Sequence, residues 1–299
     1  MRVELRNRLL FGTIIAAAVV GGLISDLARG SHVAVLVLGV LGVALGSLEY
    51  ARLARTLAAQ IPVLPMVVTS VALVLEAALH DPAISSSLPG AAGRLAGFPV
   101  ELVTIGLGLA WVVLEQMFRH GTERFFANVG AAMLGLVYLG VSFSLLMDLA
   151  LLGAPGNPGR GTQLTLAFLA TVKLGDVCAY FGGRAFGRHK LAPRISPGKT
   201  WEGFAASFVG AIGGAYMVCA ISAATGAQQP FAGWWQPAVW GLVLGPLGVA
   251  GDLAESCMKR DAAVKDSGAA VPGFGGILDI LDALILAAPV AYLLGVVLP

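Results

Sequence analysis

Residues 276–298 read GILDILDALILAAPVAYLLGVVL, an apolar run whose only charged side chains are Asp279 and Asp282, both near its beginning. A helix needs about 20 mainly apolar residues to cross the hydrocarbon core of a bilayer, so this run predicts a transmembrane helix. Over the whole chain, 57% of the residues are hydrophobic and 12% are charged, whereas a soluble domain carries about 25% charged residues. Lipid is therefore the expected solvent for most of the chain.

Other stretches of the chain meet the same length criterion, so we predict an all-α polytopic integral membrane protein with about nine transmembrane helices. The expected spans lie near residues 9–26, 33–49, 62–79, 100–117, 128–149, 163–181, 203–223, 236–254 and 276–298. We interpret the first as a membrane anchor, because no persuasive small-residue cleavage site follows it. Residues 1–160 are expected to form a scaffold of five helices. Residues 161–299 are expected to form a region of four helices that carries nearly all the unusual polar chemistry.

The positions of Lys and Arg predict the orientation, because these residues accumulate in cytoplasmic loops. If the N-terminus is cytosolic, 15 of the 19 Lys and Arg fall on the cytosolic side and three on the other. The two most basic loops, residues 182–202 and 255–275, then face the cytosol together with Asp279 and Asp282. A net charge of only +2 does not favour nucleic acid as a partner.

Two polar groups precede the last helices. Lys173 and Asp176 lie three residues apart within the sixth span, on one helix face. They are either a structural ion pair or part of a polar site, because charges at membrane depth usually pair or line a cavity. The loop of residues 183–203 is basic and contains Ser196, Lys199 and Thr200 just before a helix. Such a loop is either a topology signal or a phosphate-binding segment.

The run GDLAESCMKRDAAVKDSGAAVPGFGGILDILD, residues 251–282, is the most informative. Asp279 and Asp282 can face one divalent ion, and Asp252 can join them from the preceding helix. Hard cations such as Mg²⁺ prefer such oxygen ligands and usually share the site with substrate phosphates. Basic side chains and a glycine-rich turn accompany the carboxylates, namely Lys259, Arg260, Lys265, Gly273, Gly275 and Gly276. Together these features predict a metal-phosphate site on the cytosolic face.

These residues resemble the bacterial phosphatidate cytidylyltransferases. The family pattern of Ser, Lys-Arg, Lys-Asp, a glycine-rich turn and a closing pair of Asp is matched at Ser256, Lys259, Arg260, Lys265, Asp266, Pro272, Gly273, Gly275, Gly276, Asp279 and Asp282. The upstream segments 176–180 and 195–203 also resemble the family. Two positions depart from its pattern: Phe274 stands where His is usual, and Ile280 where Arg is usual.

The resemblance implies transfer of a cytidylyl group from CTP to phosphatidate, which gives CDP-diacylglycerol and pyrophosphate in phospholipid biosynthesis. It implies an enzyme of the bacterial inner membrane with its active site in the cytosol, surrounded by membrane lipids. The expected catalytic residues are Asp252, Lys259, Lys265, Asp279 and Asp282, and the three aspartates are also the expected Mg²⁺ ligands. The expected substrate-binding residues are Lys173, Asp176, Ser196, Lys199, Thr200, Arg260, Asp266, Gly275 and Gly276. A homodimer and a second, monovalent cation such as K⁺ are further expectations.

Three other functions remain open from the sequence. A lipid or polyprenol kinase that uses CTP would need the same metal and triphosphate contacts. An inactive nucleotide-binding paralogue would account for Phe274 and Ile280. A transporter would also contain charges within helices, although the polar groups here gather at one face of the membrane and no inverted repeat is visible.

Overall fold

The computed structural model describes residues 2–57, 60–80, 100–264, 267–268 and 275–298. Within these ranges the chain forms nine helices that are long and apolar enough to cross a membrane, which confirms the predicted fold class. Because no water is available in the hydrocarbon core, helices that satisfy their own backbone hydrogen bonds are the expected solution. The described residues also form one small sheet of two strands.

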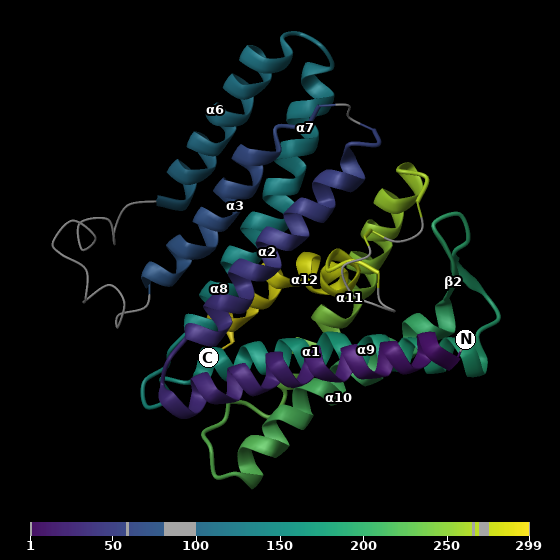
Figure 1. The fold of residues 1–299 in the computed structure, drawn as a ribbon. Helices are drawn as coiled ribbons and strands as arrows, with labels where there is room; N and C mark the ends of the chain where they lie inside the picture. The colour runs from purple at the N-terminus through teal and green to yellow at the C-terminus, as the bar shows by residue number, and fades with distance from the viewer. Residues whose placement is uncertain (1, 58–59, 81–99, 265–266, 269–274, 299) are drawn as a thin grey trace, which may run out of the picture.

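Five of these spans come from the first half of the chain. They are formed by α1 (Arg2–Arg29), α2 (Val33–Ala54), α3 (Val63–Ala77) with the short η1 (Ala78–His80), α6 (Val100–His120), and the continuous run of α7 (Phe125–Gly135), η2 (Leu136–Val141) and α8 (Ser142–Leu151). The η2 segment is a turn of π-helix, a feature that often marks a functional position within a helix. α2, α3, α6 and α7 stand together as an upright group (Figure 1).

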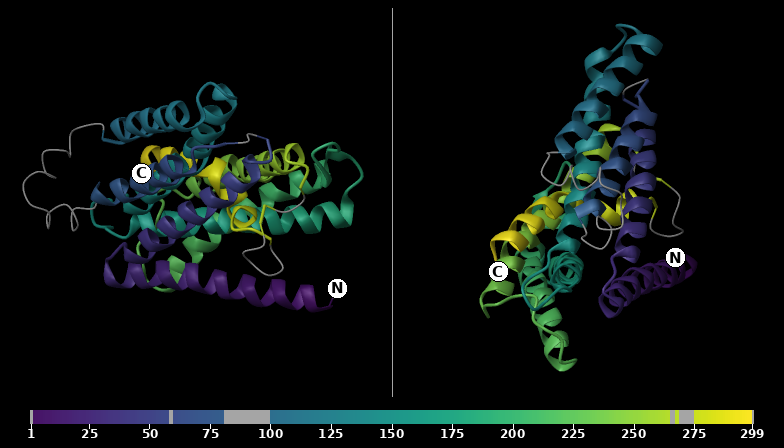
Figure 2. Two further views of the ribbon diagram at one scale, coloured as in Figure 1. Left: turned by 45° about the horizontal axis from the view of Figure 1, so that its top comes forward. Right: turned by 90° about the vertical axis from the view of Figure 1, so that its left-hand side faces the viewer.

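The second half of the chain supplies the remaining four spans and the sheet. These elements are α9 (Arg160–Phe186), β1 (Lys190–Ala192), β2 (Ser196–Thr200), α10 (Trp201–Ala224), α11 (Gln236–Asp261) and α12 (Leu278–Val297). α9 packs closely along α10, and α12 packs against α11. α1 and α9 both run across the foot of the upright group, and α1 lies at the edge of the bundle (Figure 2).

Several helices extend beyond the predicted spans, and two of these differences bear on the site. α9 continues to Phe186 and α11 to Asp261, whereas we expected spans ending near residues 181 and 254. Lys259 and Arg260 therefore lie on a helix and not in a loop. The loop predicted at 182–202 contains the antiparallel β1–β2 hairpin, in which Lys190 pairs with Thr200. In α11, polar side chains ended the predicted span too early, because Glu255 and Lys259 pair with other polar groups of the protein in place of water.

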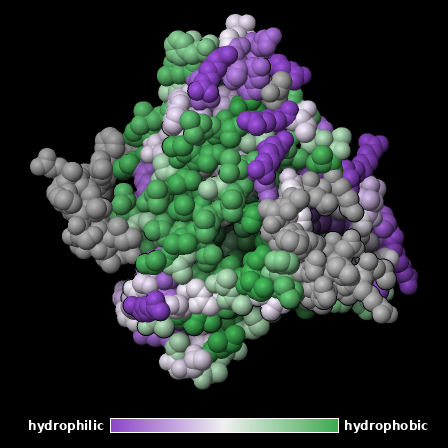
Figure 3. Space-filling model, viewed as in Figure 1, coloured by the Kyte–Doolittle hydropathy of each residue, from purple (hydrophilic) through white to green (hydrophobic). Residues whose placement is uncertain are grey.

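The closest helix contacts depend on glycine. A Cβ atom at Gly251 on α11 would lie 2.3 Å from the backbone oxygen of Asp282 on α12, so only glycine allows this approach. On the outside, large apolar side chains such as Phe118, Phe126 and Val209 are more than 70% exposed. Hydrophobic residues cover the centre of the face shown in Figure 3, and hydrophilic ones gather at its top and right. Such a surface is expected of helices that face lipid.

Candidate active site

A cleft of about 540 Å³ lies between the second-half helices and the hairpin. It is lined by α9, the β1–β2 hairpin, the first turn of α10, and the facing ends of α11 and α12. Eight of the predicted site residues line this cleft: Lys173, Asp176, Ser196, Lys199, Thr200, Asp252, Asp279 and Asp282. Residues that are up to about a hundred positions apart in the sequence therefore meet in one hollow.

The hairpin is positioned by the start of α10. Thr200 lies at the N-terminal cap of α10, where its hydroxyl oxygen accepts a hydrogen bond from the backbone N–H of Gly203 at 3.1 Å. The carboxylate of Glu202 accepts from the backbone N–H of Arg188 at 3.1 Å and lies 2.7 Å from Nδ1 of His189. These contacts hold the loop that precedes β1 against the helix. Residues of the hairpin are thereby fixed at the mouth of the cleft.

Two lysines bring positive charge into the cleft, one from the hairpin and one from α9. Lys199 Nζ lies 2.8 Å from Asp252 Oδ2 and donates to the backbone oxygen of Val249 at 3.1 Å. Lys173 Nζ donates to the backbone oxygen of Ile280 at 3.0 Å and lies 4.0 Å from Asp176 Oδ2. The predicted pair of Lys173 and Asp176 therefore exists as a long contact inside the cleft. Both side chains stay more than a third exposed, so both groups are accessible to a ligand.

Three carboxylates meet where α11 faces α12. One oxygen from each of Asp252, Glu255 and Asp282 lies within 4.8 Å of the others. Two oxygens bound to one Mg²⁺ are at most roughly 4.2 Å apart, so small side-chain movements would bring all three onto one ion. Glu255 is completely buried, and its Oε1 has no hydrogen-bond partner among the residues that the structure describes. A buried carboxylate with an unused oxygen fits a hard cation.

Asp279 has a different environment from the other predicted metal ligands. Its Oδ1 lies 2.6 Å from Lys259 Nζ. Its Oδ2 accepts from the backbone N–H of Gly276 at 2.7 Å and from the hydroxyl of Ser267 at 2.8 Å. The metal-ligand role of Asp279 stays a prediction, since this carboxylate already holds the glycine-rich turn. The sequence analysis did not identify Glu255, the third carboxylate of this group, although it lies three residues after Asp252.

The remaining predicted residues lie around the cleft or outside the described ranges. Lys259 forms ion pairs with both Glu255, at 2.5 Å, and Asp279. Arg260 donates from Nε to the backbone oxygen of Ile195 at 3.3 Å, which ties α11 to the hairpin. Gly275 adopts a φ of +98°, a conformation that favours glycine. Lys265 and Asp266, with Gly273 and Phe274, lie outside the described residues.

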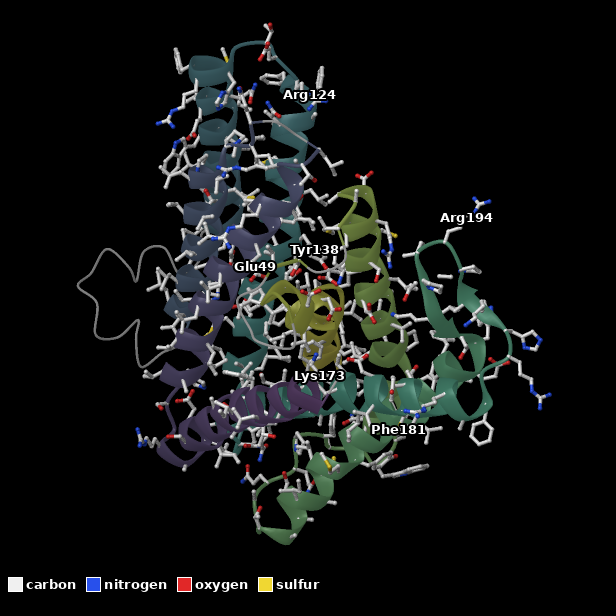
Figure 4. All side chains as sticks on the ribbon, turned by 45° about the vertical axis from the view of Figure 1, so that its right-hand side comes forward. Glu49, Arg124, Tyr138, Lys173, Phe181 and Arg194 are labelled. Carbon is white, nitrogen blue, oxygen red and sulfur yellow. The ribbon has the colours of Figure 1, made fainter. Side chains whose placement is uncertain are left out.

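Glu49 and Tyr138 reach the start of α12 from the first half of the chain. Glu49 on α2 is 3% exposed and accepts from the backbone N–H of Leu278 at 2.8 Å. Tyr138 lies in the π-helical η2, close enough to Asp282 and Glu255 to interact with their charges. Figure 4 shows Glu49, Tyr138 and Lys173 gathered around α12, whereas Arg194 lies at the far tip of the hairpin. The scaffold helices thus supply two groups next to the candidate site.

A profile of the cytidylyltransferase family matches residues 6–298. The chain belongs to the cytidylyltransferase family. This result confirms the resemblance inferred from the motifs at residues 251–282. The family match covers the N-terminal helices as well, where the sequence motifs alone carried no resemblance.

Relatives within the cytidylyltransferase family include named enzymes. The phosphatidate cytidylyltransferase of Brucella suis biovar 1 is 42% identical over 196 residues, which are 66% of this chain and 66% of that protein. The phosphatidate cytidylyltransferase of Haemophilus influenzae is 39% identical over 134 residues, 44% of this chain and 46% of that protein. The uncharacterized protein YnbB of Escherichia coli is 38% identical over 136 residues, 46% of this chain and 43% of that protein. The chain thus matches just under two thirds of the length of the Brucella protein.

The hydrogen bond from Leu278 to Glu49 gives a testable prediction about the scaffold. Glu49→Ala should destabilise the protein by about 1–3 kcal/mol, because the first N–H of α12 would be left buried without an acceptor. Glu49→Gln should cost less, since its amide oxygen can still accept. Thermal unfolding of both variants in the same detergent measures the difference. An alanine variant as stable as the wild type would show that Glu49 does not support α12.

Proposed function

We propose that the protein transfers the cytidylyl group of CTP to phosphatidate, giving CDP-diacylglycerol and pyrophosphate. The observation that carries this proposal is that Asp252 and Asp282 line one cleft with Lys199 and Lys173, while the buried Glu255 lies beside the two aspartates. A triphosphate needs both positive charge and a divalent cation, and this cleft offers groups for both. The names of the Brucella and Haemophilus relatives support the same reaction.

The reaction requires alignment more than proton transfer. A phosphate oxygen of phosphatidate attacks the α-phosphorus of CTP, a new P–O bond forms, and the bond to the β-phosphate breaks so that pyrophosphate leaves. The attacking oxygen is already anionic, so no general base is needed. When bound, Mg²⁺ would neutralise phosphate charge and polarise the α-phosphorus. Asp252, Glu255 and Asp282 would hold it, while Asp279 keeps Lys259 and the glycine-rich turn in place.

The two lysines of the cleft would each bind a phosphate group of a different substrate. Lys199 reaches Asp252 from the hairpin, so its ammonium can move from that carboxylate to a phosphate oxygen. Lys173, on α9, lies next to Ile280, the position at which Arg is usual in the family pattern. The Lys173 ammonium would supply positive charge beside position 280, where this chain has Ile and no Arg. Ser196 and Thr200 line the same wall as Lys199, although the Thr200 oxygen also caps α10.

We place the cleft on the cytosolic side of a bacterial inner membrane. The basic residues of the hairpin and of the end of α11 support this orientation, because Lys and Arg accumulate on that side. CTP would then enter from the cytosol, and phosphatidate from the lipid around α9 and α10. A homodimer and a second, monovalent cation remain expectations based on the family resemblance.

The proposed activity is tested with the purified protein in detergent, given phosphatidate, CTP and Mg²⁺. We expect CDP-diacylglycerol in the lipid phase and an equal amount of pyrophosphate in the aqueous phase. Removal of divalent cations with a chelator should stop formation of both products, and added Mg²⁺ should restore it. Intact CTP after incubation of the folded protein with both substrates and Mg²⁺ would refute the proposal.

A further inference from the structure

A second polar group lies at the other end of the helix bundle. The imidazole of His80, in η1, sits between two carboxylates from different helices. Its Nδ1 lies 3.0 Å from Asp148 Oδ1 on α8, and its Nε2 lies 3.5 Å from Glu101 Oε1 on α6. One ligand atom from each of the three residues lies within 4.8 Å of the others. Three separate helical segments therefore bring metal-binding side chains to one point.

Glu76 is a fourth ionisable side chain beside His80, Glu101 and Asp148. It lies one turn before His80, it is 8% exposed, and it interacts electrostatically with His80, Glu101 and Asp148. Neither of its carboxylate oxygens has a hydrogen-bond partner among the described residues. The side chain of Thr104 lies beside it without a hydrogen bond of normal geometry. A buried carboxylate left in this state is costly unless it takes up a proton or a cation binds it.

The charges of this group do not balance. Three carboxylates surround one imidazole, and within the described part of the chain no lysine or arginine forms an ion pair with them. With the three carboxylates ionised, the group would carry excess negative charge at the end of a membrane-spanning bundle even if His80 is protonated. A divalent cation would remove this excess.

The group is separate from the cleft. Tyr292 on α12 lies close enough to Asp148 and Glu101 to interact with their charges, whereas Asp282 at the start of α12 lines the cleft. A separation of ten positions extends about 15 Å along a helix. An ion bound here would not contact the substrates of the proposed reaction.

We propose that Glu76, His80, Glu101 and Asp148 form a binding site for a divalent transition-metal ion of the zinc class. An imidazole nitrogen combined with carboxylate oxygens suits Zn²⁺ or a related ion, whereas Mg²⁺ and Ca²⁺ prefer oxygen ligands alone. The side chain of His80 is 48% exposed and that of Glu101 is 35% exposed, so an ion can enter from the membrane surface. The bound ion would join α3 and η1 to α6 and α8.

The test uses the tag-free, full-length protein in detergent, stripped with a chelator and then titrated with Co²⁺ in excess Mg²⁺. Mg²⁺ occupies the carboxylates of the cleft, and Co²⁺ reports its ligands through its visible absorption. We expect one Co²⁺ per chain, displaced by Zn²⁺. His80→Gln should weaken binding about 100-fold or more, because it removes the nitrogen ligand. Glu101→Gln should weaken binding as well, and this second variant keeps the test decisive if His80→Gln does not fold.

Two variants serve as controls for this site. His120→Gln removes a histidine at the opposite end of α6, and Asp282→Asn removes a carboxylate of the cleft. Both should bind Co²⁺ as the wild type does. Unchanged binding in folded His80→Gln and Glu101→Gln, or loss of binding in Asp282→Asn, would overturn the proposal. The measurement requires no enzymatic turnover, so its result is independent of the proposed transferase activity.

Discussion

Asp282→Asn is expected to lower kcat by about 10²–10⁴-fold while the protein stays folded. Asp282 belongs to the carboxylate trio with Asp252 and Glu255, and a metal ion supplies several kcal/mol of charge stabilisation in the transition state. An amide retains the shape of the side chain but removes its charge. Turnover should also require a higher Mg²⁺ concentration, which a purely structural role would not cause. Initial rates over a range of Mg²⁺ concentrations measure both effects.

The matched control for Asp282→Asn is Asp26→Asn. Asp26 is a buried carboxylate outside the cleft, and it accepts from the hydroxyl of Ser31 and from backbone N–H groups at the start of α2. The control should therefore keep its rate and its Mg²⁺ dependence even if it unfolds at a lower temperature. If folded Asp282→Asn turns over at the wild-type rate with the wild-type Mg²⁺ dependence, the carboxylate trio is not the metal site.

Lys259→Met should destabilise the protein by about 3–5 kcal/mol. Lys259 is 15% exposed and lies between Glu255, which is completely buried, and Asp279, which is 11% exposed. Removing the ammonium leaves two carboxylates without their cation in a low-dielectric interior, which is the costly way to break a buried ion pair. A large fall in the midpoint of thermal unfolding in detergent is the expected observation. Lys259→Arg keeps the positive charge and should lose much less stability.

Lys190→Met is the control for this second prediction, because Lys190 lies on the exposed strand β1. Its removal should leave the unfolding midpoint nearly unchanged. Adding Glu255→Gln to Lys259→Met should restore part of the lost stability, since one of the two unpaired charges disappears. A Lys259→Met protein that unfolds at the wild-type temperature would show that this lysine does not hold the two carboxylates together.

The membrane-spanning helices could be predicted from the sequence because the bilayer sets their length and polarity. The end of α11 could not, because hydropathy treats every charged residue as if it faced water. Lys259 belongs to a helix whose polar residues pair with α12 across the cleft. Hydropathy alone does not distinguish such inward-facing charges from those of a loop.

The candidate site was predictable where its residues share one motif. The spacing of Asp279 and Asp282 placed both on one side of α12, and both line the cleft. Glu255 follows Asp252 by three residues, so the same helix-face argument would have found it. Glu49 could not be found in this way, because it is separated from Leu278 by 229 positions. Only the packing of α2 against α12 brings them together.

The proposed reaction at the cleft transfers a cytidylyl group and not a phosphoryl group. The most direct measurement compares CTP labelled at the α-phosphorus with CTP labelled at the γ-phosphorus, each incubated with phosphatidate and Mg²⁺. We predict that the α-label enters the lipid and that the γ-label leaves in pyrophosphate. Transfer of the γ-label to the lipid, with release of CDP, would identify a CTP-dependent lipid kinase and contradict this account.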